Sequence, residues 1–283
     1  MSGPAGRDSD ATAAADQSRE RTAGPTDGTA ERVARSLAGA VGFLTRIPAG
    51  ADSRSWESFR RTPGAIVAVG YLAGALVAAP VWLAVALGVP APTVALVLPA
   101  AVVAVTGINH ADGLADLGDA AVVHGDHEAR LAVLKDSAVG VGGTLALALL
   151  VAGLALAGWA LSALPPLTAA GVVVAAEVSA KLGLATLACL GTAPHDGLGA
   201  QLTRVSSAAD LPVPVLVAVP AAFATWPGTA AAGALVGGVA AALLTWRWAA
   251  GLVGGTSGDV FGATSELARL VALHAGVIAW TLS

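Results

Sequence analysis

The sequence predicts an all-α, polytopic integral membrane protein, a bundle of about seven transmembrane helices with polar active-site loops on the cytoplasmic face. Of the 283 residues, 55% are apolar and only 12% are charged, about half of the roughly 25% charged residues of soluble domains. Aromatic residues make up only 4%, so small side chains dominate, and these let helices approach closely within lipid. Several long apolar windows also come near the ~20 residues that a bilayer core requires.

The chain divides into a tail and one domain. Residues 1–30 are rich in small, polar and charged residues without apolar periodicity, which is typical of disorder, and we expect a disordered cytoplasmic tail. Residues 31–283 are expected to form a single membrane-embedded catalytic domain. At its start, Leu37, Val41 and Leu44 share a helical spacing, which predicts an amphipathic or partly inserted helix.

Seven apolar windows follow this segment, and the connections between them are of two kinds. The windows cover residues 64–88, 92–108, 141–163, 167–190, 211–226, 229–252 and 264–282. Short uncharged connections alternate with the longer polar segments 109–140, 191–210 and 253–263. The alternation puts these polar segments and the amino-terminal region on the same face, and most of the basic residues belong to it. The positive-inside rule therefore places this face in the cytoplasm. We therefore expect a multi-pass protein of the plasma membrane, in contact with lipid.

Charge and cysteine content limit the remaining classes. The net charge of −4 comes without a basic stripe or an RNA-binding aromatic motif, which argues against a nucleic-acid partner. The single cysteine, Cys189, lies in an apolar run and is interpreted as a small packing residue.

The most informative polar stretch follows the second window. If this stretch is helical, Asp112, Asp116 and Asp119 stand at i, i+4 and i+7 on one face, where they repel one another unless a cation neutralises them. Oxygen ligands at this density favour Mg²⁺ or Mn²⁺. A solvated acidic loop or helix-capping aspartates are the structural alternatives. Nearby, His110 is a candidate general base, a metal ligand or an interfacial hydrogen-bonding residue.

Three other polar groups are candidates for function. Lys135, Asp136 and Ser137 precede glycines at a predicted helix start, which suits phosphate binding, although a simple N-cap also explains Asp136 or Ser137. The island 254–266 contains glycines that permit close approach of a ligand, although a flexible loop explains it nearly as well. Inside the fourth window, Glu177 and Lys181 are spaced for an i,i+4 pair and indicate either a structural ion pair or a substrate or transport path.

Taken together, these stretches resemble the cobalamin synthase family, membrane enzymes that join the two halves of the cobalamin nucleotide loop. Five ordered stretches carry the resemblance, which extends from about residue 36 to the end of the chain. They are Phe43-Leu44-Thr45-Arg46-Ile47-Pro48, Val69-Gly70 with Gly74, His110-Ala111-Asp112-Gly113-Leu114-Ala115-Asp116 with Asp119, Lys135-Asp136-Ser137 with Gly140 and Gly143, and Thr256-Ser257-Gly258-Asp259-Val260-Phe261-Gly262-Ala263 with Glu266. Asp196-Gly197-Leu198-Gly199 resembles a later acidic-glycine loop of the family, whereas Ala138 and Ser257 depart from its pattern.

The resemblance implies transfer of the adenosylcobinamide phosphate group from adenosylcobinamide-GDP to α-ribazole or α-ribazole 5′-phosphate, with release of GMP. The cofactor that it implies is Mg²⁺, and oligomerisation is left open. The metal ligands expected from it are Asp112, Asp116, Asp119, Asp259 and Glu266. The expected catalytic residues are His110, Asp112, Asp116 and Asp136, and the expected substrate-binding residues are Arg46, Lys135, Ser137, Asp196, Thr256, Ser257 and Gly258.

Two other classes of protein are weighed against this one. A CDP-alcohol phosphatidyltransferase also uses an Asp-Gly-x-x-Ala motif and a divalent metal, but Asp116 stands where that motif expects arginine. Its downstream aspartates are also absent after Asp119. A secondary transporter would show inverted internal repeats and polar groups near the bilayer midplane, whereas no clear repeat is present and the polar clusters gather on one predicted face.

Overall fold

The computed structural model describes residues 28–134 and 138–283, and these contain helices and no strand. Val33–Ser283 forms one compact unit. Residues 1–27 and the predicted site residues Lys135, Asp136 and Ser137 lie outside the described residues. The helices are α2 (Thr29–Leu44), α3 (Ser53–Arg60), α4 (Pro63–Ala86), α5 (Ala91–Thr106), α6 (Asn109–Val122), α7 (His127–Val133), α8 (Val141–Leu161), α9 (Pro166–Leu190), α10 (Leu198–Thr203), η1 (Ala208–Asp210), α11 (Pro212–Ala218), η2 (Val219–Phe223), α12 (Ala230–Val253) and α13 (Gly258–Thr281).

The described helices confirm an all-helical, multi-pass membrane protein with fewer clear spans than the sequence predicts. Four helices, α4, α8, α9 and α12, are long and apolar enough to cross a membrane, and the bent pair α5 and α6 raises the number to five. The predicted number of about seven is not confirmed. The other apolar windows fold into a short helix pair, α11 and η2, and into α13, which carries three charged residues, Asp259, Glu266 and Arg269.

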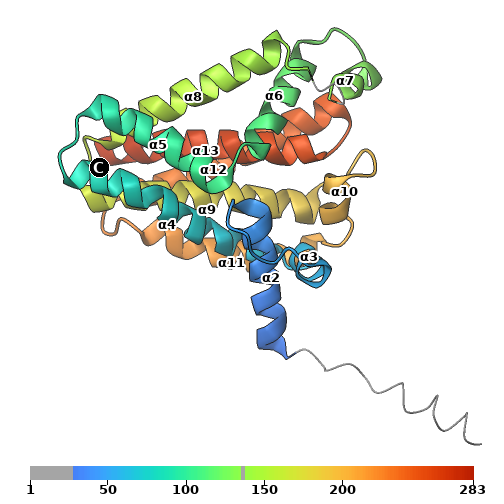
Figure 1. Ribbon diagram of the computed structural model, residues 1–283, viewed down its shortest axis with the longest axis horizontal. Helices are drawn as coiled ribbons and strands as arrows, with labels where there is room; N and C mark the ends of the chain where they lie inside the picture. The colour runs from blue at the N-terminus through green and yellow to red at the C-terminus, as the bar shows by residue number, and fades with distance from the viewer. Residues whose placement is uncertain (1–27, 135–137) are drawn as a thin grey trace, which may run out of the picture. The chain divides into compact units, whose positions relative to one another are not determined.

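Helix α9 is the centre of the unit. Every residue from Ala175 to Cys189 is buried, and α4, α12 and α13 pack around the helix. Figure 1 shows α4, α5, α8, α9, α12 and α13 running roughly alongside one another, with α6, α7 and α10 near one end. A helix buried on all sides can carry polar groups away from lipid, and α9 contains Glu177 and Lys181.

Close contact between α4 and α9 depends on two glycines spaced one helical turn apart. A Cβ atom added at Gly70 would lie 3.0 Å from Val178 Cα, and one added at Gly74 would lie 2.9 Å from Val174 Cα. Larger side chains would therefore separate the helices, as expected for small residues at helix contacts in membranes.

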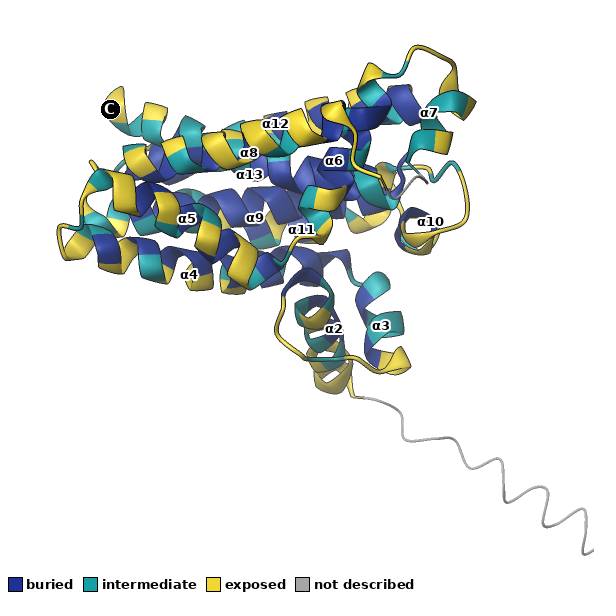
Figure 2. Cartoon of the chain, turned by 45° about the horizontal axis from the view of Figure 1, so that its top comes forward, coloured by how far each residue is buried: buried dark blue, intermediate teal, exposed yellow. Residues whose placement is uncertain are grey.

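The outer surfaces of the surrounding helices are apolar. On α8, Leu145, Leu149, Leu156 and Trp159 are all exposed, and Figure 2 shows exposed residues along α5, α8 and α12. Apolar side chains on the outside of a bundle, around a buried centre that contains charges, are typical of a protein whose solvent is lipid.

Polar contacts of Ser36 and an aromatic cluster hold the hairpin of α2 and α3 together. Ser36 Oγ donates to Ser58 O at 3.1 Å. The rings of Phe43, Trp56 and Phe59 contact one another with centroids 5.2 to 5.6 Å apart. Such tilted aromatic contacts hold ring positions better than aliphatic packing alone, so the hairpin presents a defined aromatic surface.

Helix α3 of this hairpin has a capped start. The Asp52 carboxylate accepts the Ser55 hydroxyl at 2.7 Å and the backbone N–H groups of Arg54 and Ser55 at 3.0 Å each. These hydrogen bonds, that from the Ser55 side chain foremost, hold the pKa of Asp52 below its usual value. The cap satisfies donors that the first helical turn leaves free and so fixes where α3 begins.

Candidate active site

The candidate site starts at a sharp bend between α5 and α6. Gly107 ends α5 with φ +75°, a conformation that favours glycine, and the axes of the two helices differ by 103°. The backbone N–H of Arg46 donates to Val105 O at 2.8 Å, and a Cβ atom at Gly107 would meet Arg46 Cγ at 3.5 Å. The exposed side chain of Arg46 therefore lies beside the start of the acidic helix.

The acidic stretch is helical, as the spacing argument required. Asp112, Asp116 and Asp119 lie on α6, but they do not share one environment. Asp112 is exposed and Asp116 is partly exposed, whereas Asp119 is buried. The expected metal ligands on this helix are therefore divided between an accessible pair and a buried residue.

Asp119 already uses both carboxylate oxygens. They accept the backbone N–H groups of Gly140 at 2.7 Å and Gly143 at 2.9 Å. A Cβ atom at Gly143 would lie 2.7 Å from one of the same oxygens. The buried carboxylate thus connects α6 to the start of α8, the helix that follows Lys135 in the sequence.

The amino-terminal end of α13 packs directly against α6. A Cβ atom at Gly113 would lie 2.8 Å from Asp259 Cα, and one at Gly262 would lie 2.9 Å from the carbonyl oxygen of His110. These two glycines bring backbones almost 150 residues apart in the sequence into contact. His110 and Asp259 consequently belong to one site.

The polar island 254–266, for which a flexible loop was the alternative interpretation, is only partly a loop. Helix α13 begins at Gly258, because the Ser257 side chain caps it by accepting the Val260 N–H at 3.4 Å. Residues from Val260 to Glu266 are buried. The sequence prediction of a helix from residue 264 was wrong at this end, since polar and small side chains there face protein instead of lipid.

Asp112, Asp116 and Asp259 form an accessible group, here called the acidic face. The Asp116 carboxylate lies within electrostatic range of Asp112 and Asp259 and also of Asp119. Within residues 28–134 and 138–283, no three acidic, histidine or cysteine side chains are close enough to hold a metal ion without further ligands. Mg²⁺ is commonly held by one or two carboxylates together with water and substrate phosphates, so the oxygen ligands of this face fit that ion.

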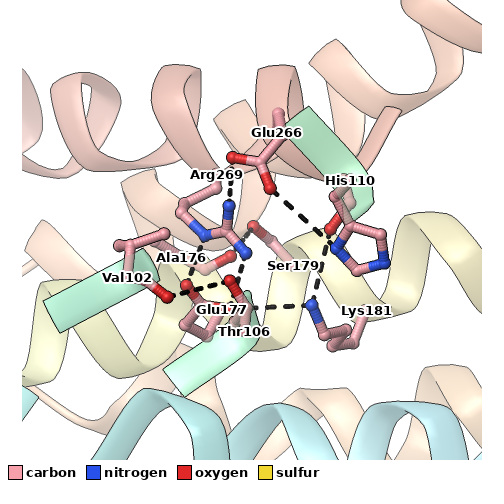
Figure 3. Close-up of polar contacts among 10 residues, drawn as sticks. Val102, Thr106, His110, Ala176, Glu177, Ser179, Lys181, Glu266 and Arg269 are labelled. Carbon is pink, nitrogen blue, oxygen red and sulfur yellow. Dashed lines mark hydrogen bonds and ion pairs between the residues drawn. The ribbon is translucent and has the colours of Figure 1, made fainter. Parts of the chain in front are cut away.

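Glu266 belongs to a different cluster, shown in Figure 3. Arg269 donates to both Glu177 and Glu266, and Lys181 Nζ lies 3.8 Å from Glu177 and 3.4 Å from Ser265 Oγ. All four charged side chains are at most 4% exposed. We call Glu177, Lys181, Glu266 and Arg269 the buried ion network.

The buried ion network tests what the sequence indicated about the charges inside α9. The i,i+4 pair of Glu177 and Lys181 is confirmed. The sequence alone did not assign partners to Arg269, which is 1% exposed and pairs with two carboxylates. Periodicity in an apolar helix does not reveal which neighbour supplies counter-charges.

His110 connects the network to an open cavity. Its Nδ1 atom lies 3.9 Å from Glu266 Oε1 and is buried without a hydrogen-bond partner. The same residue, together with Asn109, His195 and Asp259, lines a cavity of about 350 Å³. The rest of the wall is mainly apolar and comes from six helices, with Phe43 and Leu44 of α2, Phe59 of α3, Ile66 of α4, Leu184 of α9, Leu198 and Leu202 of α10, and Gly258 and Phe261 of α13.

Of the predicted substrate-binding residues that the structure describes, only Gly258 lines this cavity. Thr256 is buried, accepting the Trp246 indole N–H at 2.9 Å. Ser257 caps α13 and donates to Asp259 at 3.2 Å. Both residues therefore shape the chain around Asp259.

Asp196 lies apart from the main cavity. It pairs with Arg204 at 2.7 Å, and both line a smaller hollow of about 250 Å³ next to Arg60. Asp196 is thus the acidic partner of a basic side chain on a separate surface.

Sequence reasoning missed the apolar part of the site. Phe59, Leu184 and Leu202 carry no motif, and nothing in their spacing separates a cavity wall from an ordinary core. Asn109 and His195 directly precede the predicted site residues His110 and Asp196. This adjacency in the sequence was the signal that could have identified them.

The chain matches one protein family over most of its length. The family model described as cobalamin-5-phosphate synthase matches residues 36–277. A protein from Halorubrum lacusprofundi named adenosylcobinamide-GDP ribazoletransferase is 54% identical over 87% of this chain and 98% of its own length. Proteins of the same name from Halobacterium salinarum and Haloquadratum walsbyi are 56% and 43% identical, over 69% and 88% of this chain and 98% and 100% of their own lengths.

No solved structure matches the chain. The family match nevertheless covers the hairpin, the acidic face, the buried ion network and most of α13. The chain therefore belongs to the cobalamin-5-phosphate synthase family.

Proposed function

We propose that this chain is a transferase of the last stage of cobalamin synthesis. It moves the adenosylcobinamide phosphate group from adenosylcobinamide-GDP to α-ribazole or α-ribazole 5′-phosphate. GMP leaves, and adenosylcobalamin or its 5′-phosphate forms. The observation that carries this proposal is that His110 and Asp259 line one cavity, with Asp116 of the acidic face within electrostatic range of Asp259. The chain is also similar over most of its length to proteins named for this reaction.

The bond changes are simple to balance. A ribose hydroxyl of the acceptor attacks the phosphorus atom next to cobinamide, a P–O bond to the acceptor forms, and the anhydride bond to GMP breaks. Because the phosphorylated acceptor keeps its 5′-phosphate in the product, a hydroxyl other than the 5′ position attacks. Positioning and charge neutralisation are the main needs of such a phosphoryl transfer.

In this proposal Asp112, Asp116 and Asp259 hold Mg²⁺. The ion would neutralise charge on the phosphate oxygens. Support comes from the acidic face itself, where carboxylates lie within electrostatic range of one another and remain at least partly exposed. We leave Asp119 and Glu266 out of the set, because Gly140 and Gly143 occupy the first and Arg269 the second.

His110 is the proposed general base. Its side chain lines the cavity next to Asp259, where it would take the proton of the attacking hydroxyl. Arg46, exposed beside the bend at Gly107, would contact a phosphate. Lys135, Asp136 and Ser137 keep their proposed phosphate-binding and catalytic roles on the sequence motif alone.

We further propose that seven segments lie in the bilayer, namely α4, α5, α8, α9, the pair α11 and η2, α12 and α13. The turns after α4, α8 and η2 contain no charged residue, whereas α6, α7, the hairpin and the segment 191–210 around α10 carry charges. The positive-inside rule then places the cavity on the cytoplasmic side of the plasma membrane.

The two rival functions lose support. The family match covers residues 36–277, which does not favour a CDP-alcohol phosphatidyltransferase. For a transporter, Glu177 and Lys181 would be a coupling site, but their charges are taken up in the buried ion network with Arg269.

The deciding experiment measures GMP release and corrinoid products from purified full-length protein given adenosylcobinamide-GDP and α-ribazole. We expect product with Mg²⁺ and none with EDTA. Folded protein that yields no product under either condition would contradict the proposed reaction. Product formation that EDTA leaves unchanged would contradict the Mg²⁺ proposal alone.

A further inference from the structure

We propose that the apolar cavity binds the flat aromatic base of the acceptor nucleoside, with the hairpin of α2 and α3 as its wall. This inference rests on the proposed function. It assigns a substrate-recognition role to residues without any polar chemistry, chiefly Phe43, Phe59 and Leu202.

The position of the cavity restricts what it can hold. His110 and Asp259, which the proposed reaction places at the phosphoryl centre, line the same cavity as the apolar residues. Whatever fills the cavity must therefore be attached to the reacting atoms by a short link. In the acceptor, only the ribose ring separates the attacking hydroxyl from the base.

The size of the cavity argues against the corrin ring. Its volume is about 350 Å³, near the lower end of the roughly 300–1,000 Å³ of small-molecule pockets. A corrin macrocycle with its amide arms has several times as many atoms as a nucleoside, so it cannot enter as a whole. The corrinoid must stay outside while the acceptor enters.

Hydrogen-bonding chemistry separates the acceptor base from guanine. The edge of guanine carries several donors and acceptors, which would lose their water against phenylalanine, leucine and isoleucine side chains at considerable cost. The dimethylbenzimidazole of α-ribazole has one free ring nitrogen and an otherwise apolar edge. The apolar side of the wall, with Phe43, Phe59, Ile66 and Phe261, suits the benzimidazole, whereas the polar lining residues Asn109, His110, His195 and Asp259 are left for the ribose and the reacting groups.

The aromatic cluster of the hairpin explains how the wall keeps its shape. The rings of Phe43 and Phe59 are 5.4 Å apart, and Trp56 contacts both. Phe59 is 1% exposed and Leu202 is 3% exposed, so their positions are set by packing. A rigid aromatic wall binds a flat ring with little loss of side-chain freedom.

The test narrows the cavity with Leu202→Phe and compares it with Leu190→Phe, a leucine 41% exposed at the end of α9 and outside the cavity. We expect Leu202→Phe to raise KM for α-ribazole by about tenfold, as contacts of one or two methylenes in apolar pockets do. KM for adenosylcobinamide-GDP should change less than threefold, and Leu190→Phe should change neither. The riboside of unsubstituted benzimidazole, which lacks the two methyl groups, should be less affected than α-ribazole.

A rise in KM for adenosylcobinamide-GDP instead would show that the donor occupies the cavity and overturn the proposal. Unchanged kinetics for both substrates would do the same and favour a lipid chain or water as the occupant. If Leu202→Phe does not fold, Leu198→Phe replaces it, since Leu198 lines the cavity but is 36% exposed.

A binding measurement separates this proposal from the reaction. Leu198→Cys is labelled with a maleimide in a Cys189→Ala background, and α-ribazole is expected to slow labelling at least threefold, whereas GMP is not. Protection without any GMP release would contradict the proposed reaction and keep the base site. Turnover without protection would overturn the base site and keep the reaction.

Discussion

The acidic face and the buried ion network contain the same kinds of side chain in opposite circumstances. Asp112, Asp116 and Asp259 gather with one another near the cavity and repel. In the network, two carboxylates meet Lys181 and Arg269 at almost zero exposure. The acidic face contains no cationic side chain of its own, so a bound cation would stabilise it. The buried ion network already pairs its two carboxylates with two cationic side chains.

The two clusters therefore differ in what they contribute: the buried ion network to stability and the acidic face to function. Buried charges that are paired and hydrogen-bonded are costly to break but add little beyond what well-packed apolar residues would contribute. Carboxylates that repel one another lower the stability of the fold, and such groups are typical of functional sites. We therefore expect substitutions in the network to act on folding and substitutions in the acidic face to act on turnover.

The largest effect is expected from Arg269→Met. It leaves Glu177 and Glu266 without their shared partner, and breaking a buried ion pair in this way costs about 3–5 kcal/mol. The measurement is thermal unfolding of the detergent-purified protein together with the yield of folded material. Arg247→Met, at an exposed position on α12, is the matched control and should unfold like the parent, so equal losses in both variants would contradict the role of the network.

Asp116→Asn should lower turnover without lowering stability, the opposite of Arg269→Met. It removes a proposed Mg²⁺ ligand and relieves repulsion from Asp112 and Asp259. We expect GMP release to fall by at least about 100-fold, as for loss of one strong electrostatic contact in a transition state, with thermal stability unchanged or raised. Glu128→Gln, an exposed carboxylate on α7, should keep full activity. Parent-like turnover of Asp116→Asn would remove this residue from the metal site.

Much of this architecture follows from the sequence, because lipid imposes a simple rule on long helices. The apolar window 167–190 corresponds to α9 (Pro166–Leu190), and the window 141–163 to α8 (Val141–Leu161). The acidic stretch is also helical, as the spacing of its aspartates assumed. The apolar windows do not specify how many helices cross the membrane. Hydropathy alone does not distinguish the buried polar turns of a helix from a loop. Helix α13 shows this, because it begins at Gly258, before the apolar window that starts at residue 264.

The site was predictable only in part. Motifs identified His110, Asp112, Asp116 and Asp259, but whether they meet depends on two glycine contacts between α6 and α13 that no local pattern specifies. Glu266 was assigned to the metal by its place in a motif, whereas its neighbour one turn on, Arg269, takes its carboxylate. Pairing across helices is a property of tertiary packing and is not encoded in periodicity.

Asp119→Asn distinguishes the buried aspartate from the accessible pair on the same helix. The asparagine side chain keeps one acceptor, so one of the N–H groups of Gly140 and Gly143 loses its partner. Gly143 is buried whereas Gly140 is exposed. An unsatisfied buried donor costs about 1–3 kcal/mol, and we expect a loss of up to this size in thermal unfolding. The Mg²⁺ concentration for half-maximal GMP release should stay within about threefold of the parent value, since Asp119 is outside the proposed metal set. A large increase in that concentration would return Asp119 to the metal site.

The smallest effect is expected from Lys181→Met, which tests the network from its weaker side. Lys181 Nζ lies 3.8 Å from Glu177 and 3.4 Å from Ser265, whereas Arg269 donates directly to both carboxylates. With Arg269 still in place, Glu177 keeps a partner, so we expect a loss of about 1 kcal/mol in thermal unfolding, as for one net hydrogen bond. Methionine retains the length of the aliphatic stem and fills the space of lysine. A loss as large as that of Arg269→Met would show that both cations are equally needed and that the network is stabilised by charge balance instead of by the arginine contacts.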